Sequence, residues 1–157
     1  MTRPRARRAS LGRAAVLALL LAGCAAEAPP PAEPAPAPPP PPVGWREIPT
    51  LNTTGDIVSG YVQTRGLVST GQVRRAWILL NLREPVPIPE TGGRALSVRF
   101  LGEYRCAARQ WRPIEGAWFA RQNAQDPVHA ERPRGAGFRP AEPATLGGSF
   151  LDAACGL

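Results

Sequence analysis

The chain has 157 residues, a length that allows one domain and leaves little for a second. Its formal net charge is +7, and all 19 basic residues are arginines. Five of these arginines lie within the first 13 residues, in a segment that we expect the mature protein to lose, and the remaining 14 face 12 acidic residues. A nucleic-acid-binding protein needs a sustained basic surface in its final form, so the composition excludes that class.

Residues 1–23 have the organisation of an export signal. An arginine-rich start is followed by nine apolar residues, Ala14 to Ala22, and by the small residue Gly23. A helix that crosses a bilayer needs about twenty apolar residues. We therefore predict a signal peptide that is removed, and not a transmembrane anchor.

The motif Leu21-Ala22-Gly23-Cys24 closes this segment and resembles the lipobox of bacterial lipoproteins. The resemblance implies a diacylglycerol on the sulfur of Cys24, cleavage just before that residue, and attachment to a membrane through the lipid. Ala25 stands where lipoproteins retained at the inner membrane carry aspartate, which implies an outer-membrane lipoprotein. Its domain would face either the cell surface or the periplasm.

The other two cysteines, Cys106 and Cys155, remain as one pair if Cys24 carries lipid. Export to an oxidising compartment allows these two to form a disulfide. The alternative is a pair of buried thiols without a bridge.

Residues 24–43 comprise Cys24 and an Ala/Pro-rich spacer, with ten prolines between Pro29 and Pro42. Proline fixes φ and removes a backbone donor, so this segment cannot pack as sheet or helix. We predict an extended polyproline II spacer that reaches roughly 40 Å. Such a spacer would hold the folded domain away from the lipid surface.

We expect the folded domain to occupy residues 44–157, and its pattern is mostly β. The clearest strand is 96–106, where apolar and polar side chains alternate, so that Phe100, Tyr104 and Cys106 share one face. A second strand is expected at 73–82. It is apolar on both faces in its middle, which indicates a central strand covered on two sides.

Two further strands are expected at 45–48 and 58–63. The segment 111–119 contains Pro113 and Gly116, so we predict an edge strand or a bulged strand there. Connections are expected at 85–93, 123–127 and 132–137.

A short helix is expected at the end of the chain. Ser149 suits the N-cap, Asp152 the capping-box position and Gly156 the position after the last turn. Leu151 and Cys155 are four residues apart and share a face. A helix of about six or seven residues is unstable alone, so we expect a Cys106–Cys155 bridge to hold it on the sheet. The predicted fold class is α+β and mostly β, a single antiparallel sheet with a short C-terminal helix tethered by one disulfide.

The sequence indicates no enzyme, no catalytic residue, no metal site and no cofactor. His129 is the only histidine, which argues against multi-histidine metal sites and a Cys/His pair. A Gly-x-Ser-x-Gly elbow and a phosphate-binding loop are both missing from the sequence. Nothing in the pattern distinguishes Glu103 and Glu115 from other acidic residues.

Trp111, Arg112 and Trp118 are candidates for a protein interface. Tryptophan and arginine are typical anchors of such interfaces when they are exposed. The alternative is that the two tryptophans pack beneath a loop. Trp77 lies inside the apolar strand and is expected in the core.

Four short motifs follow one another along 44–157: Trp45-Arg46-Glu47-Ile48, Gly71 to Trp77, Glu103 to Cys106 with Arg109, and Gly147-Gly148-Ser149 through Cys155. In this order they resemble the motifs of the surface-adhesin protein E family. Thr53-Thr54-Gly55-Asp56 replaces the family's aromatic-aromatic-aspartate segment, and Phe138 stands where a second tryptophan is common. The resemblance implies an antiparallel sheet with a C-terminal helix tethered by a disulfide.

Characterised members of that family bind host extracellular-matrix and serum proteins. The resemblance therefore implies a lipid-anchored surface binding module for extracellular proteins. The alternative is a periplasm-facing structural or assembly lipoprotein that contacts other envelope proteins and has no adhesive role.

Overall fold

The computed structural model describes residues 40–51, 55–66 and 68–156. The predicted signal peptide, Cys24 and most of the spacer lie outside the described residues, as do Thr53 and Thr54. Among the described residues, no helix is long and apolar enough to cross a membrane. The elements are β1 Trp45–Glu47, the 3-10 helix η1 Pro49–Leu51, β2 Ile57–Gln63, β3 Val68–Thr70, β4 Val73–Pro87, β5 Arg94–Arg105, β6 Gln110–Arg121, β7 Gln125–Glu131, β8 Arg139–Pro140 and α1 Leu146–Cys155.

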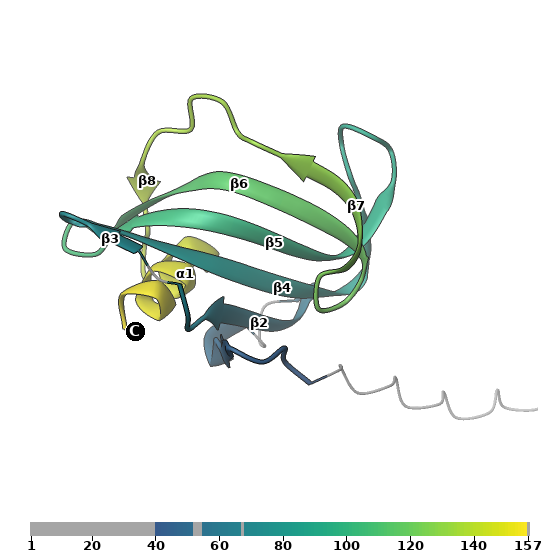
Figure 1. Ribbon diagram of the computed structural model, residues 1–157, viewed down its shortest axis with the longest axis horizontal. Coiled ribbons are helices and arrows are strands. Elements are labelled where there is room, and N and C mark those ends of the chain that lie inside the picture. Colours follow the sequence, from purple (N-terminus) through teal and green to yellow (C-terminus); the bar gives the residue numbers. More distant parts are fainter. Residues whose placement is uncertain (1–39, 52–54, 67, 157) are drawn as a thin grey trace, which may run out of the picture. The chain divides into compact units, whose positions relative to one another are not determined.

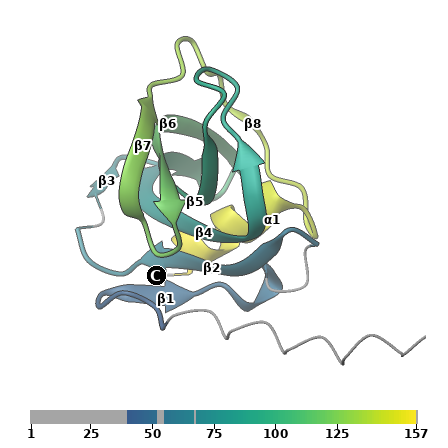
Figure 2. The same ribbon diagram turned by 90° about the vertical axis from the view of Figure 1, so that its right-hand side faces the viewer.

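The strands form one antiparallel sheet in the order β1-β2-β4-β5-β6-β7 (Figure 1). The short strand β3 pairs with the start of β4, and β8 pairs with the start of β6. The sheet is curved, and α1 lies against one of its faces (Figure 2). This arrangement confirms the predicted fold class for the described residues.

The two long central strands, β4 and β5, appear where the sequence predicts them. Phe100 and Tyr104 share the face toward α1, as predicted: Tyr104 is in the core, and Phe100 packs against the core and against Phe150 of α1. Ser97 and Glu103 on the other face are also buried. β4 continues further than predicted, through Pro85 and Pro87, which we expected in a loop. Prolines are tolerated there because β2 reaches only Leu82, so this part of β4 pairs with β5 alone.

The predicted bulge in 111–119 is confirmed. Gly102 pairs with Pro113 and Leu101 with Glu115, so the register shifts by one residue at this point. β7 pairs with the second half of β6 and β8 with its first two residues. Pro113, whose nitrogen has no hydrogen to donate, therefore lies in the one stretch of β6 that β5 alone accompanies.

The strands β3, β7 and β8 were not predicted. β7 begins at Gln125, so the expected loop at 123–127 is shorter than predicted. Asn123, Ala124 and Asp126 all have positive φ, which places a tight turn between β6 and β7. The residue types in this segment predict a loop, but they do not predict which residues have positive φ or where the strand after the turn begins.

The helix begins earlier than predicted, at Leu146, and its N-cap is Thr145 rather than Ser149. The Thr145 hydroxyl accepts a hydrogen bond from the Gly148 amide at 3.1 Å. Gly147 and Gly148 lie inside the helix, where close packing leaves no room for a side chain. A Cβ at position 147 would lie 2.5 Å from Nε1 of Trp111, and a Cβ at position 148 would lie 2.1 Å from the Glu142 carbonyl oxygen.

α1 packs on the sheet through an aromatic cluster and a covalent link. The Phe150 ring lies 5.1 Å from that of Phe100 and 5.5 Å from that of Trp111, in edge-to-face arrangements. The predicted disulfide is confirmed, since Cys155 at the end of α1 is bonded to Cys106 just after β5. The helix end is thereby fixed to the sheet.

We predict that Cys106→Ser lowers the free energy of unfolding by about 4 kcal/mol, because the bridge closes a loop with a sequence separation of 49 residues. In a domain of this size that corresponds to a fall in melting temperature of roughly 15 °C. Thermal unfolding of the purified full chain in detergent measures it. Cys24→Ser is the matched control and should melt like the parent, whereas equal melting of all three proteins would contradict the prediction.

Candidate functional site

An arginine-rich surface lies at one end of the sheet, on the face opposite α1. We call it the arginine surface and define it by Arg75, Arg105, Arg112 and Phe138. It forms because Arg75 of β4, Glu103 of β5 and Arg112 of β6 are in register across three neighbouring strands. Side chains alternate along a strand, so the residues beside Tyr104 point away from the core that Tyr104 enters.

Glu103 is the centre of this surface and is only 4 % exposed. One carboxylate oxygen accepts hydrogen bonds from Arg75 at 2.9 and 2.6 Å. The other accepts from Arg112 at 2.7 Å and lies 2.6 Å from a second nitrogen of the same guanidinium. Two arginines therefore bind one carboxylate, which leaves one positive charge in excess and fixes both guanidinium groups.

The electrostatic balance at Glu103 favours the ionised carboxylate. Burial raises the pKa of Glu103, but the hydrogen bonds and charges of Arg75 and Arg112 outweigh it, so the pKa lies below its ordinary value. The two arginines remain accessible, since their side chains are 51 % and 36 % exposed respectively. The arginine surface therefore presents two guanidinium groups whose positions are fixed by the buried carboxylate of Glu103.

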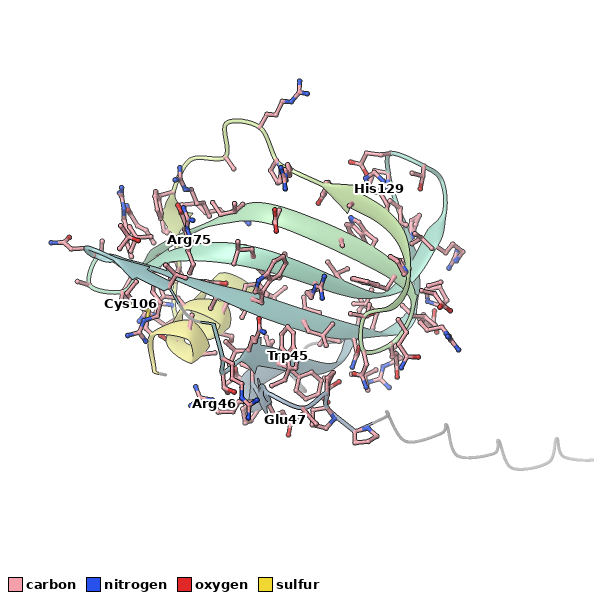
Figure 3. All side chains as sticks on the ribbon, viewed as in Figure 1. Trp45, Arg46, Glu47, Arg75, Cys106 and His129 are labelled. Carbon is pink, nitrogen blue, oxygen red and sulfur yellow. A yellow bond between two sulfur atoms is a disulfide. The ribbon has the colours of Figure 1, made fainter. Side chains whose placement is uncertain are left out.

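Phe138 adds an aromatic element to the arginine surface. The guanidinium of Arg105 lies 3.8 Å from the centre of its ring, and that of Arg112 lies 4.6 Å from it. Cation–π contacts of this kind hold an arginine over a ring while its polar edge can still donate hydrogen bonds. Figure 3 marks Arg75 at this end of the sheet.

The three predicted interface residues do not form one patch. Trp111 is 8 % exposed, and its ring contacts those of Tyr104 and of Phe150 in α1. It belongs to the core between the sheet and α1, and is neither an exposed anchor nor packed beneath a loop. Arg112 points to the other face and joins the arginine surface. Trp118 is half-buried and lies in register with Val98 and His129 on the α1 face. Only Arg112 and Trp118 remain as interface candidates.

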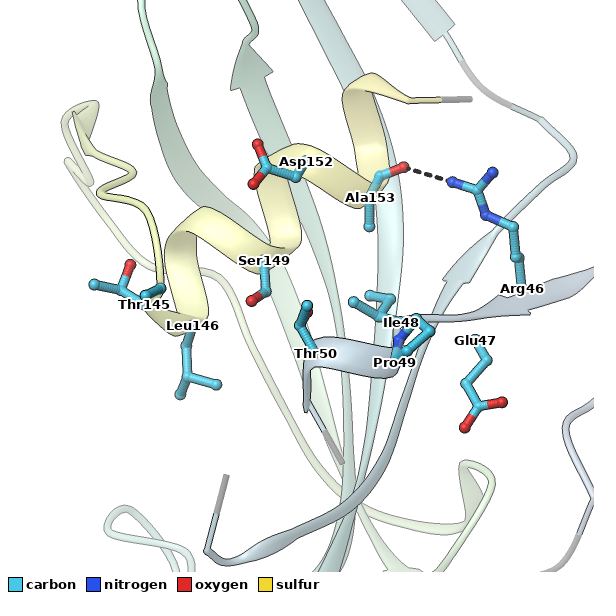
Figure 4. A pocket seen from close by; sticks show the side chains of 11 residues that line it. Arg46, Glu47, Ile48, Pro49, Thr50, Thr145, Leu146, Ser149, Asp152 and Ala153 are labelled. Atoms are coloured by element: carbon cyan, nitrogen blue, oxygen red, sulfur yellow. Dashed lines mark hydrogen bonds between the residues drawn. The ribbon is translucent and has the colours of Figure 1, made fainter. Parts of the chain in front are cut away.

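A groove of about 960 Å³ lies on the α1 face, between β1–η1 and α1 (Figure 4). Leu146, which is 40 % exposed, and Ile48 and Pro49 contribute its apolar lining. At its rim Arg46 donates a hydrogen bond to the Ala153 carbonyl at 3.1 Å. No local pattern in the sequence marks this groove, because its two walls come from opposite ends of the domain sequence and only the fold brings them together.

Residues 45–156 match the sequence family described as surface-adhesin protein E. The chain belongs to this family. No curated protein matches the sequence.

Solved structures of Haemophilus influenzae protein E share the fold of this adhesin E family member. A second crystal form of that protein aligns with a TM-score of 0.56 and 16 % identity, over 78 % of this chain and 94 % of the other. Protein E from non-typeable Haemophilus influenzae aligns with a TM-score of 0.52 and 16 % identity, over 77 % and 79 %. This chain and protein E therefore share a fold.

We predict that Glu103→Gln lowers the free energy of unfolding by about 2 kcal/mol at pH 7, since Arg75 and Arg112 lose their ionised partner. Because the folded pKa is lowered, the stabilisation by Glu103 is full above its ordinary pKa of 4.5 and is lost as the pH falls below that value. The difference between parent and variant should shrink accordingly in denaturant titrations from pH 7 to pH 3.

Glu115→Gln is the matched control for this measurement. Glu115 lies on the neighbouring strand, where its partner Arg132 is largely exposed, so its loss should cost less than about 0.5 kcal/mol. Parallel stability profiles of the parent and the Glu103 variant across this pH range would contradict the account of Glu103.

Proposed function

We propose that this protein is a lipid-anchored, adhesin-like binding protein of the cell surface that contacts extracellular proteins. The observation that carries the proposal is the match to the surface-adhesin protein E family over residues 45–156. The domain would begin at residue 44, after a signal peptide at 1–23 and a spacer at 24–43. Lipid on Cys24 would attach it to the outer membrane, and the spacer would hold it above the lipid.

The arginine surface is the part of the domain that we propose makes the main contact. Arginine and aromatic side chains dominate the binding energy of many protein interfaces. Arg75 and Arg112 are already held by Glu103, and Arg105 by Phe138, so binding immobilises less side-chain freedom than it would for loose arginines. The excess positive charge favours a partner segment rich in carboxylates.

We predict that Arg105→Ala weakens binding to the preferred extracellular-matrix or serum protein by about tenfold, because a charge and its aromatic contact are removed. Surface plasmon resonance of the full chain in detergent, against a panel of such proteins, measures it. Arg134→Ala is the matched control, since it removes the same charge from an exposed turn. Equal losses in both variants would show a non-specific charge effect, and a panel without any binder would contradict the adhesin proposal.

The side of the outer membrane on which the domain lies can be tested separately. We expect protease treatment of intact cells to release the 44–157 domain, because the proline-rich spacer at 24–43 is predicted to be extended and open to cleavage. Cys24→Ser protein should no longer fractionate with membranes. A domain that survives until the outer membrane is opened would support the periplasm-facing alternative instead.

A further inference from the structure

Three potential metal ligands meet where the turn between β4 and β5 approaches β7. Glu90 belongs to that turn, whereas His129 and Glu131 are two residues apart on β7 and share a face. One ligand atom from each of the three side chains lies within 4.8 Å of the others. Figure 3 shows His129 on β7, at the side of the domain where the β4–β5 turn lies.

The imidazole of His129 has an unsatisfied nitrogen that points into this cluster. Its Nε2 atom is buried and has no hydrogen-bond partner among the residues that the structure describes. Oε2 of Glu90 lies 4.0 Å from it, too far for a hydrogen bond. A buried nitrogen without a partner costs free energy, and a cation held jointly by the imidazole and the carboxylates would remove that cost.

The donor set indicates which cation would fit. One imidazole nitrogen and two carboxylate oxygens suit Zn²⁺, which binds such ligands at about 2.0–2.2 Å. Two ligands of one Zn²⁺ ion therefore lie roughly 3–4 Å apart, so the present spacing needs only small rotations of the glutamate side chains. Ca²⁺ prefers six to eight oxygens and would be poorly served by a site with a nitrogen.

We propose that Glu90, His129 and Glu131 form a Zn²⁺ site. The ion would join the β4–β5 turn to the edge strand β7 and would neutralise the carboxylates of Glu90 and Glu131, which lie close together. Three protein ligands leave a further coordination position open to water or to a donor from another molecule. The sequence indicated no metal site, because His129 is the only histidine and Glu90 meets it only through the fold.

Isothermal titration of ZnCl₂ into the full chain, purified in detergent without a histidine tag, tests the site. We expect one saturable site per chain. His129→Ala and Glu131→Gln should each weaken Zn²⁺ binding by more than about 100-fold, because loss of an outer-shell partner alone costs roughly 10- to 100-fold. Glu142→Gln, an exposed carboxylate before α1, is the matched control and should bind like the parent.

Thermal unfolding provides a second measurement. Zn²⁺ should raise the melting temperature of the parent and of Glu142→Gln but not that of His129→Ala, and Ca²⁺ at the same concentration should have no effect. Glu90→Gln changes only an exposed turn residue, so it should fold normally and still bind Zn²⁺ more weakly. Absence of saturable Zn²⁺ binding, retained binding in His129→Ala, or equal stabilisation by Ca²⁺ would overturn the proposal.

Discussion

The contact between α1 and the sheet is the constraint on which the other features of this domain depend. A ten-residue helix with two glycines in its first turn is not stable by itself. Tertiary contacts stabilise it: Phe150 packs in the aromatic cluster, and Cys155 is bonded to Cys106. Arg46 and Arg74 donate hydrogen bonds to the last carbonyls of the helix, where cations also interact favourably with its dipole. Gly147 and Gly148 allow the first turn of the helix to lie close to Trp111 and to the Glu142 carbonyl.

Because α1 determines which side of each strand faces the core, it also determines which residues can form a binding surface. Tyr104 and Trp111 enter the core, and their neighbours Glu103 and Arg112 must then point to the opposite face. A buried carboxylate is costly unless it is paired, and here two arginines in register supply the pairing. The positions of Arg75 and Arg112 are therefore a consequence of strand register, and Phe138, in the connection just before β8, adds the contact that holds Arg105.

The sequence predicted what depends on local pattern. The alternation in 96–106, the apolar run in 73–82 and the cysteine pair led to the central strands and the disulfide. The prediction failed where tertiary contacts override local preference: Gly147 and Gly148 lie inside the helix, and Trp111 and the Glu142 carbonyl leave no room for a side chain at these positions. Trp111 and Arg112 were grouped as neighbours in sequence, although alternation places them on opposite faces. The groove and the Glu90–His129–Glu131 cluster combine residues from separate elements, and no local pattern marks them.

This chain and protein E differ widely in sequence. At 16 % identity the two proteins share a fold, and nothing about a ligand follows from that likeness. The candidate binding features of this chain lie outside the α1–sheet core. The arginine surface lies on the face opposite α1, the groove lies beside α1, and the proposed Zn²⁺ site joins β7 to the β4–β5 turn. The arginine surface, the groove and the proposed Zn²⁺ site share no residue. A substitution in one of them therefore removes no side chain of the other two, and the contribution of each to binding can be measured separately.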